Sequence, residues 1–293
     1  REALNEVNSD DGIKDFTGKN WRLEFGQYRF GEPDYTPTEA KNKSATYDVP
    51  IYVEATLTNL RTGAAQTQEV FLADLPKMTS VGTFVVNGIE RAVVTQLVRS
   101  PGVFFSGEKD NRSGKTFHTA ELRPMRGSWL EMTVGKRDLI TIKIDRRRRM
   151  PVTVLLRALG YSSDEEILEL LSDEMEMDQY KLIENSLNRD ATKSEEEALI
   201  ELYEKMRPGE PASVDTARDY LHQLFFDPRR YDLHEVGRYK LNRRLGLDLD
   251  HDITVLSRED LVATVKYLIR LQNGEGKVDD IDHLSNRRVR LVG

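Results

Sequence analysis

The period of the hydrophobic pattern changes along the chain, from two to 3.6. Apolar side chains occupy every second position from Ile51 to Leu57, which is typical of a strand that buries one face. After Pro151 the apolar residues recur at intervals of three and four, as they do on one face of an amphipathic helix. This change predicts an α+β fold, in which a β-rich domain precedes a mixed, mainly α-helical domain.

Turn signals divide the first part of the chain into hairpins. Arg61-Thr62-Gly63 lies between two β-prone runs, and Asn87-Gly88 is a pair that two-residue hairpin turns favour because both positions need positive φ. The pattern breaks at 99–102, and 110–115 is a polar loop that contains glycine. We place the domain boundary in this region. Alternation then returns between 130 and 144.

Capping residues mark the expected helix starts in the second part. Ser162 with Glu165, and Ser257 with Asp260, match the spacing of capping boxes, and Ser213 precedes a further apolar run. The apolar stripes that define two of these helices are Ala198, Leu199, Leu202 and Met206, and then Leu261, Val265, Leu268 and Ile269. The acidic run 173–178 is interpreted as a solvated connection.

Composition sets the broad class of the protein. The chain has 293 residues, of which 38% are hydrophobic, and this length favours two domains. It has no cysteine, so thiolate zinc sites and disulfides are excluded and a reducing compartment, the cytoplasm, is expected. No apolar run approaches the roughly 20 residues that a membrane-spanning helix needs. We therefore expect a soluble protein without a membrane partner.

Charge is unevenly distributed along the chain. The formal net charge is −7, which by itself argues against nucleic-acid binding. Residues 121–150 nonetheless contain nine Lys or Arg against four Asp or Glu, whereas 161–220 contain six against eighteen. Such a chain can present one cationic face to DNA while the remainder stays acidic.

No motif of a self-contained active site is present. The histidines lack the spacing of a helical zinc hydrolase, and neither a G-x-S-x-G elbow nor a phosphate-binding P-loop occurs. Asp279, Asp280 and Asp282 could together bind Mg²⁺. The favoured alternative is that they cap helices or pair with Arg287 and Arg288. We therefore predict neither a catalytic residue nor a metal ligand in this chain.

Three features could serve nucleic-acid binding. The arginine run 146–149 offers guanidinium forks to phosphate, although a solvated edge or salt bridges to the acidic helical segment explain it equally well. Trp129 could stack on an unpaired base, although a core or interface tryptophan is the more common case. A second basic zone, 229–244, is more simply explained as a solvated helical face.

Several longer runs carry a family resemblance. They are GTFVVNGIER (82–91), QLVRSPGV (96–103), RGSW (126–129), IDRRR (144–148), MRPGEP (206–211), YDL (231–233) and VDDIDHL (278–284). In this order they resemble the bacterial RNA polymerase β subunit. The resemblance spans nearly the whole chain and implies a segment of a longer subunit.

The resemblance implies a domain organisation and a set of partners. Residues 1–99 would form the protrusion domain and 100–281 the lobe domain, with 282–293 returning toward the protrusion. The segment would form one wall of the DNA channel in DNA-directed RNA polymerase, a nucleotidyltransferase, and would contact downstream and nontemplate-strand DNA. Its partners would be DNA, the β′, α and ω subunits and sigma factor. The catalytic Mg²⁺ would be held by β′, so this segment would bind no cofactor of its own.

The resemblance also implies site residues. A pocket for an unstacked guanine of the nontemplate strand would be lined by Arg99, Ile281, Asp282 and Arg287, and Trp129 would stack on an adjacent base. The residues near the DNA backbone would be Arg147, Arg148, Arg207 and Arg243. One wall of the rifamycin-type inhibitor pocket would contain Arg91, Val94 and Gln96.

Two other classes of function are alternatives. The isolated chain could act as a docking module without DNA binding of its own, with an exposed sheet edge near 65–69 that receives a strand of a transcription or repair factor. In the family, the edge that receives the transcription-repair coupling translocase often reads Ile-Lys-Glu, whereas Ala65-Gln66-Thr67 stands here, a departure that argues against this contact. A free-standing nucleotide-handling enzyme is not supported, because no Gly-rich phosphate loop, carboxylate dyad or histidine base is present.

Overall fold

The computed structural model describes residues 4, 7, 8, 12–15, 17–172 and 180–290. The chain forms two compact units, Arg1–Thr95 and Gln96–Gly293. The first unit is mainly β, and the second combines a sheet with helices. The fold is therefore α+β, as the change in hydrophobic period predicts. The expected return of 282–293 toward the first domain stays a prediction.

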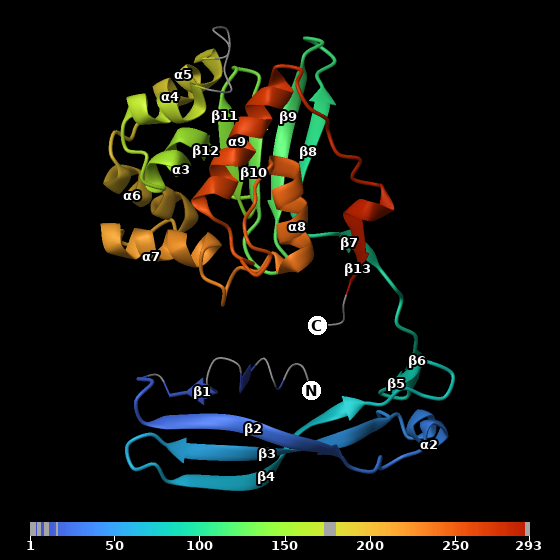
Figure 1. Ribbon diagram of the computed structural model, residues 1–293. Coiled ribbons are helices and arrows are strands. Elements are labelled where there is room, and N and C mark those ends of the chain that lie inside the picture. Colours follow the sequence, from blue (N-terminus) through green and yellow to red (C-terminus); the bar gives the residue numbers. More distant parts are fainter. Residues whose placement is uncertain (1–3, 5–6, 9–11, 16, 173–179, 291–293) are drawn as a thin grey trace. The chain divides into compact units, whose positions relative to one another are not determined.

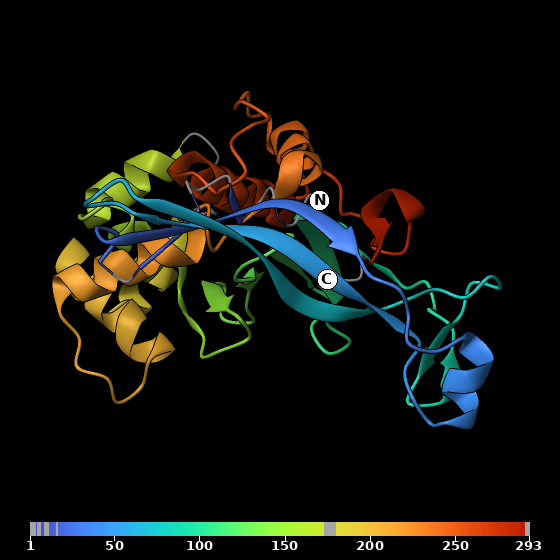
Figure 2. The same cartoon turned by 90° about the horizontal axis from the view of Figure 1, so that it is seen from below.

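A four-stranded antiparallel sheet dominates the first unit (Figures 1 and 2). Its strands, in spatial order, are β1 (Ile13–Lys14), β2 (Trp21–Phe30), β3 (Asp48–Asn59) and β4 (Ala65–Pro76). The predicted alternation lies in β3, where Val53 is buried and Ile51 and Ala55 are half-buried. Its last position is wrong as a core position, because Leu57 is 42% exposed. The turn at 61–63 joins β3 to β4 and confirms the predicted hairpin. β4 forms one edge of the sheet.

A second hairpin contains the Asn87-Gly88 turn. It joins β5 (Phe84–Val86) to β6 (Ile89–Arg91), and the two turn residues have the predicted positive φ, 49° and 76°. Glycine is also needed for space, because a Cβ atom at Gly88 would lie 2.7 Å from the Cα atom of Ser44. Helix α2 (Pro37–Asn42) packs against β5 (Figures 1 and 2).

The second unit is built on a five-stranded antiparallel sheet with the order β12-β11-β10-β9-β8 (Figure 1). Its strands are β8 (Gly102–Lys109), β9 (Thr116–Arg123), β10 (Leu130–Val134), β11 (Ile140–Ile144) and β12 (Met150–Pro151). The alternation predicted between 130 and 144 corresponds to β10 and β11, and its interruption is the turn between them. The polar loop 110–115 joins β8 to β9.

The two faces of this sheet differ in character. Alternate residues such as Ala120, Leu122, Met132 and Ile142 are fully buried in the core, because successive side chains of a strand point to opposite faces. The half-buried charged residues at the intervening positions are Glu121, Arg123, Glu131 and Lys143. A row of charged side chains therefore lies along the face opposite the core.

Helices follow the sheet, as predicted from the change of period at Pro151. They are α3 (Val152–Ala158), α4 (Asp164–Ser172), α5 (Tyr180–Arg189), α6 (Glu195–Met206), α7 (Val214–Phe225), α8 (His234–Leu245) and α9 (Arg258–Gln272). α8 and α9 pack on β8 and β9 (Figure 1). The starts predicted at Ser213 and Ser257 are confirmed, since each hydroxyl accepts from the N–H three residues on. Of the helices that the structure describes, none has the length and apolar character to span a membrane.

The helix start predicted at Ser162 and Glu165 is wrong by one residue. Ser163 and Glu166 exchange the capping hydrogen bonds, at 3.0 and 3.2 Å. The carbonyl of Ser162 instead accepts from the buried guanidinium of Arg157, a tertiary contact that the capping pattern does not encode. The acidic run predicted as a connection at 173–178 lies outside the described residues.

A buried ion pair ties α8 to α9. Arg238 and Asp260 are both fully buried, and Nη1 of the arginine lies 2.7 and 2.9 Å from the two carboxylate oxygens. The other guanidinium nitrogens donate to the carbonyls of Ile253 and Val255. Asp260 also accepts from the N–H of Ser257 at 2.7 Å. Both charges are thus fully hydrogen-bonded, which is the condition under which a buried pair is tolerated.

We expect Asp260→Ala to lower the free energy of unfolding by about 3–5 kcal/mol, because it leaves Arg238 buried without its counter-charge. Asp215→Ala is the control, since that carboxylate is 96% exposed beside Arg218 and should contribute little. Urea unfolding followed by helical circular dichroism measures both variants. Equal losses for the two variants would contradict the structural role of the buried pair.

Candidate nucleic-acid interface

A two-stranded ladder brings together the residues predicted to form a base pocket. β7 (Leu97–Arg99) pairs antiparallel with β13 (Arg287–Val289), and Arg99 lies directly opposite Arg287. Like charges at facing positions repel each other. Each arginine has a carboxylate partner: Asp282 pairs with Arg287, and a carboxylate oxygen of Glu121 lies 2.6 Å from Nη1 of Arg99. Arg99, Arg287 and their two carboxylate partners therefore form a cluster of two cations and two anions.

Three aspartates shape the loop that precedes β13. Asp279 accepts from a backbone N–H of β8 at 2.8 Å, and Asp280 accepts from the N–H of Asp282 at 2.9 Å. The side chain of Asp282 is 84% exposed and pairs with Arg287. Ile281, which lies between Asp280 and Asp282 in the chain, is half-buried. The three aspartate carboxylates thus have separate partners, and the carboxylate of Asp282, beside the ladder, faces solvent.

Lys240 on α8 contacts both the segment after β7 and the loop before β13. Its amine lies 2.5 Å from the Ser100 hydroxyl and 2.5 Å from the carbonyl oxygen of Ser285. One contact fixes the residue after Arg99, and the other fixes the loop before β13. Burial lowers the pKa of this amine, and the negative charge of Asp279 opposes the shift.

A tight turn holds Trp129 at the sheet surface. Its N–H donates to the Asp145 carboxylate at 2.8 Å, and its carbonyl accepts from the Asp145 N–H at 2.9 Å. Asp145 and Arg146 have φ values of 47° and 59°, as in a type I′ turn. The guanidinium carbons of Arg123 and Arg146 lie 4.3 and 5.3 Å from the centroid of the indole. Trp129 is 39% exposed, so the alternative of a core tryptophan is wrong.

The arginines predicted to contact the DNA backbone lie on different elements. Arg147 donates to the carbonyl of Met206 at the end of α6, next to Arg207 in the chain. Arg148 is exposed in the turn that follows β11. Arg243 is exposed on α8. The structure thus brings Arg147 close to the Arg207 backbone and leaves Arg243 on a separate helix.

Comparison with known proteins decides the family. Residues 99–290 match the family model described as RNA polymerase Rpb2, domain 2. The chain also aligns with the DNA-directed RNA polymerase subunit beta of Chloroflexus aggregans (strain MD-66 / DSM 9485), with 44% identity over 323 aligned positions. The chain belongs to the RNA polymerase β-subunit family. The alignment covers 100% of the chain and 26% of that relative, so the chain spans about a quarter of the relative's length.

The predicted inhibitor-pocket residues of this β-subunit chain fall in both units. Arg91 ends β6 and Val94 is 78% exposed, both in the first unit. Gln96 begins the second unit, where its carbonyl accepts from the N–H of Arg290 at 2.8 Å. The inhibitor pocket stays a prediction.

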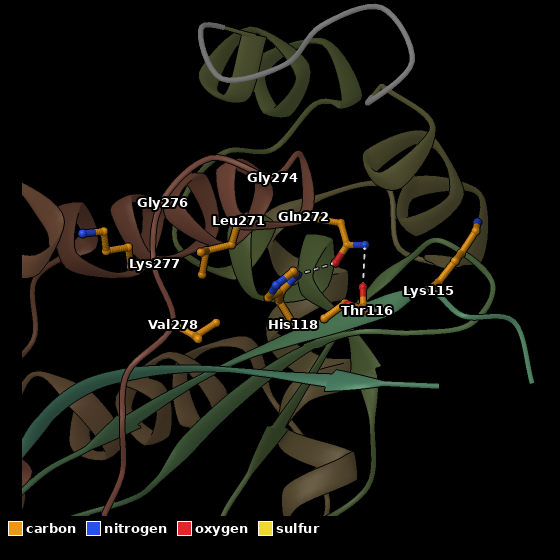
Figure 3. Close-up of a pocket in the computed structure, with 9 residues that line it drawn as sticks. All are labelled: Lys115, Thr116, His118, Leu271, Gln272, Gly274, Gly276, Lys277 and Val278. Carbon is orange, nitrogen blue, oxygen red and sulfur yellow. Dashed lines mark hydrogen bonds between the residues drawn. The ribbon is translucent and has the colours of Figure 1, made fainter. Parts of the chain in front are cut away.

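The β-subunit chain also has a cavity of about 830 Å³ between β9 and the residues after α9 (Figure 3). Oε1 of Gln272 accepts from Nδ1 of His118 at 3.0 Å, and Nε2 of Gln272 donates to the carbonyl of Thr116 at 3.0 Å. These contacts occupy the amide of Gln272 and one ring nitrogen of His118 (Figure 3). The predicted site residues do not line this cavity.

Three residues of the β-subunit site are not singled out by the sequence. Glu121 and Arg123 stand two apart on β9 and therefore share a face, but their partners Arg99 and Trp129 come from other segments. Lys240 belongs to the second basic zone, for which a solvated helical face is the simpler interpretation. The sequence signal for Glu121 and Arg123 is a pair of charged residues two positions apart. This signal identifies a shared face only when the bounds of β9 are known.

We expect Asp145→Ala to shift the emission of Trp129 to longer wavelength and to cost about 2 kcal/mol of stability, because an alanine would adopt φ of 47° and the backbone N–H of Trp129 would lose its acceptor, the Asp145 carboxylate. A Trp21→Phe background isolates the emission of Trp129. Asp138→Ala is the matched control, because Asp138 has φ of 50° in the turn at the other end of β10 and β11. It should lower stability without changing the emission. An unchanged spectrum for Asp145→Ala would contradict this account of how Trp129 is held.

Proposed function

We propose that this segment forms part of the DNA-channel wall of DNA-directed RNA polymerase and reads a guanine of the nontemplate strand. The observation that carries the proposal is the β7–β13 ladder, which sets Arg99 opposite Arg287 beside the exposed carboxylate of Asp282. Family membership supports it, because the matched range 99–290 contains all of these residues.

The chemistry of the three side chains suits the Watson–Crick edge of guanine. That edge has two adjacent N–H donors and a carbonyl acceptor. The carboxylate of Asp282 can accept from the donors, and a guanidinium of Arg99 or Arg287 can donate to the acceptors of the base. Adenine has an acceptor where guanine has its ring N–H, so it does not match a carboxylate in the same way. In the DNA-free chain Arg287 pairs with Asp282, and guanine would share or replace this contact.

Trp129 and the surface arginines would complete the strand-binding surface. The partly exposed indole of Trp129 offers a face on which an adjacent base can stack. Arg147, Arg148 and Arg207 would contact phosphates near the end of α6, and Arg243 would do so from α8. Phosphate contacts fix the position of the strand and carry no sequence information, whereas the pocket residues discriminate between bases.

Nucleotidyl transfer and assembly with β′, α, ω and sigma are proposed for the complete polymerase in the cytoplasm. The resemblance assigns the catalytic Mg²⁺ to β′. Within the described part of the chain, no group of three or more His, Cys, Asp or Glu side chains is arranged to hold a metal ion. Because the resemblance assigns the catalytic Mg²⁺ to β′, the role proposed for this segment is to bind and orient DNA.

Binding of the intact chain to a single-stranded oligonucleotide with one guanine tests base reading. We expect tighter binding than to the same strand with adenine at that position. Asp282→Ala and Arg287→Ala should each reduce the preference by about 10-fold, because a good two-point contact to a base contributes about 1–3 kcal/mol of discrimination. Fluorescence anisotropy over a salt series gives both affinities.

Arg148→Ala is the control for that experiment. Loss of a phosphate contact should weaken both complexes equally and lower the salt slope by about one. A guanine preference that survives in Asp282→Ala would contradict base reading by this carboxylate. If the intact chain shows no preference, the same variants are compared in the complete polymerase on pre-melted DNA, and equal affinities there would refute the proposal.

The edge strand of the first unit supports a second candidate function. β4 is the edge of its sheet, and residues 65–69 are exposed. An edge strand offers backbone donors and acceptors to a strand of another protein. We therefore propose this edge as a docking surface for a strand of a transcription or repair factor. The family's transcription-repair coupling translocase is the partner to test, although Ala65-Gln66-Thr67 departs from the residues that it usually meets.

Restoring the usual residues of that edge tests the docking function. We expect the triple variant Ala65→Ile, Gln66→Lys and Thr67→Glu to bind the purified translocase more tightly than the unchanged chain, because side chains alternate along a partner strand and give specificity to its backbone pairing. Calorimetric titration measures both affinities. No binding by either chain would exclude the edge as a docking surface for this partner.

A further inference from the structure

One carboxylate oxygen connects the candidate base pocket to the stacking residue. Oε2 of Glu121 accepts from Nη1 of Arg99 at 2.6 Å and from Nε of Arg123 at 2.8 Å. The three side chains are between 19% and 27% exposed, so water competes weakly for these hydrogen bonds. Arg99 belongs to the β7–β13 ladder, whereas Arg123 lies on the indole of Trp129. Two separate recognition elements therefore share one acceptor.

The ring of Trp129 is already in contact with protein cations. Arg123 and Arg146 both lie within cation–π distance of it. The adjoining cavity, which Glu121 also lines, has a volume of about 60 Å³, enough for about two water molecules and too small for a nucleobase. Arg123 is the nearer of the two guanidinium groups, and a base that stacks on the part of the ring that Arg123 covers must displace it.

We propose that Glu121 is a positioning residue that couples occupation of the Trp129 stacking site to guanine recognition by Arg99. This inference rests on the proposed function. When a base displaces Arg123 from the indole, the hydrogen bond from Arg123 to Glu121 is weakened. The carboxylate oxygen is then left to Arg99, whose guanidinium is held more firmly beside Arg287 and Asp282. A stacked base thereby prepares the neighbouring pocket for guanine.

The coupling is positive and reciprocal. Two cations that share one acceptor oxygen repel each other and compete for it, so removal of one strengthens the contact of the other. By linkage, guanine in the pocket must favour stacking on Trp129 by the same factor. We expect a factor of about five or more, at the lower end of coupling between binding sites in proteins.

Glu131 provides a matched control for Glu121. It lies opposite Glu121 in the register of β9 and β10 and has similar exposure, 31% against 26%. Its carboxylate pairs with Lys143 at 3.3 Å, whereas Glu121 accepts from Arg99 of the ladder and from Arg123 on the indole. Glu131→Gln removes the same charge from the same face of the sheet without removing the shared acceptor.

The test uses complete polymerase with pre-melted DNA of four kinds. The nontemplate strand carries guanine or adenine at the pocket position, and a base or an abasic site at the adjacent stacking position. Dissociation rates give the guanine preference with and without a stacked base. In the unchanged enzyme the preference should be about five-fold larger when the base is present.

Glu121→Gln should retain a guanine preference that no longer depends on the stacked base, and Glu131→Gln should keep the dependence. Arg123→Ala should also lose the dependence on the stacked base, because no second cation on Glu121 remains for that base to displace. This variant tests the coupling if Glu121→Gln does not fold. A purely structural role of Glu121 would instead change all four rates together. A guanine preference without coupling in the unchanged enzyme, or coupling that persists in Glu121→Gln, overturns this inference alone. Absence of any guanine preference overturns the proposed function itself.

Discussion

Charge neutralisation around the Arg99–Arg287 pair is the interaction on which the candidate site depends. The β7–β13 register sets two guanidinium groups face to face, an arrangement that is unfavourable unless anions accompany it. Asp282 accompanies Arg287, and Glu121 accompanies Arg99. The amine of Lys240 then donates to the Ser100 hydroxyl after β7 and to the Ser285 carbonyl before β13. The proposed base pocket is therefore pre-formed around ion pairs, and guanine would compete with Arg287 for the carboxylate of Asp282.

The two faces of the sheet in the second unit separate the core from the residues proposed for recognition. Side chains on one face enter the core, and the alternate positions carry the charged row that contains Glu121 and Arg123. Charges that serve stability are placed elsewhere: Arg238 and Asp260 are sealed between α8 and α9 with complete hydrogen bonding. Because the charged row is half-buried, its contacts are strong enough to orient side chains and still able to exchange with a polar ligand.

Local signals predicted the elements that local chemistry determines. The Asn87-Gly88 hairpin, the hairpin at 61–63 and the start of α9 at Ser257 follow from turn and capping rules. The β7–β13 ladder does not follow from turn or capping rules, because its strands come from distant parts of the sequence. Each strand has three residues, too few for a periodic signal. The residues of the proposed pocket were identified through the family resemblance. Glu121 was missed because its role depends on the register of β9 against partners from β7 and the turn at Trp129.

The acidic balance of the chain is consistent with selective rather than general binding of DNA. A net charge of −7 gives little attraction to phosphate as a whole, and the ladder arginines are already paired with carboxylates. Phosphate can compete for such an arginine, but it has no donor for the carboxylate that is released. Guanine provides donors and acceptors on one edge and so can satisfy both members of a separated ion pair. If the proposed function holds, pre-pairing of Arg287 with Asp282 lowers the affinity for the DNA backbone more than the affinity for the base, which favours recognition of sequence over binding of any strand.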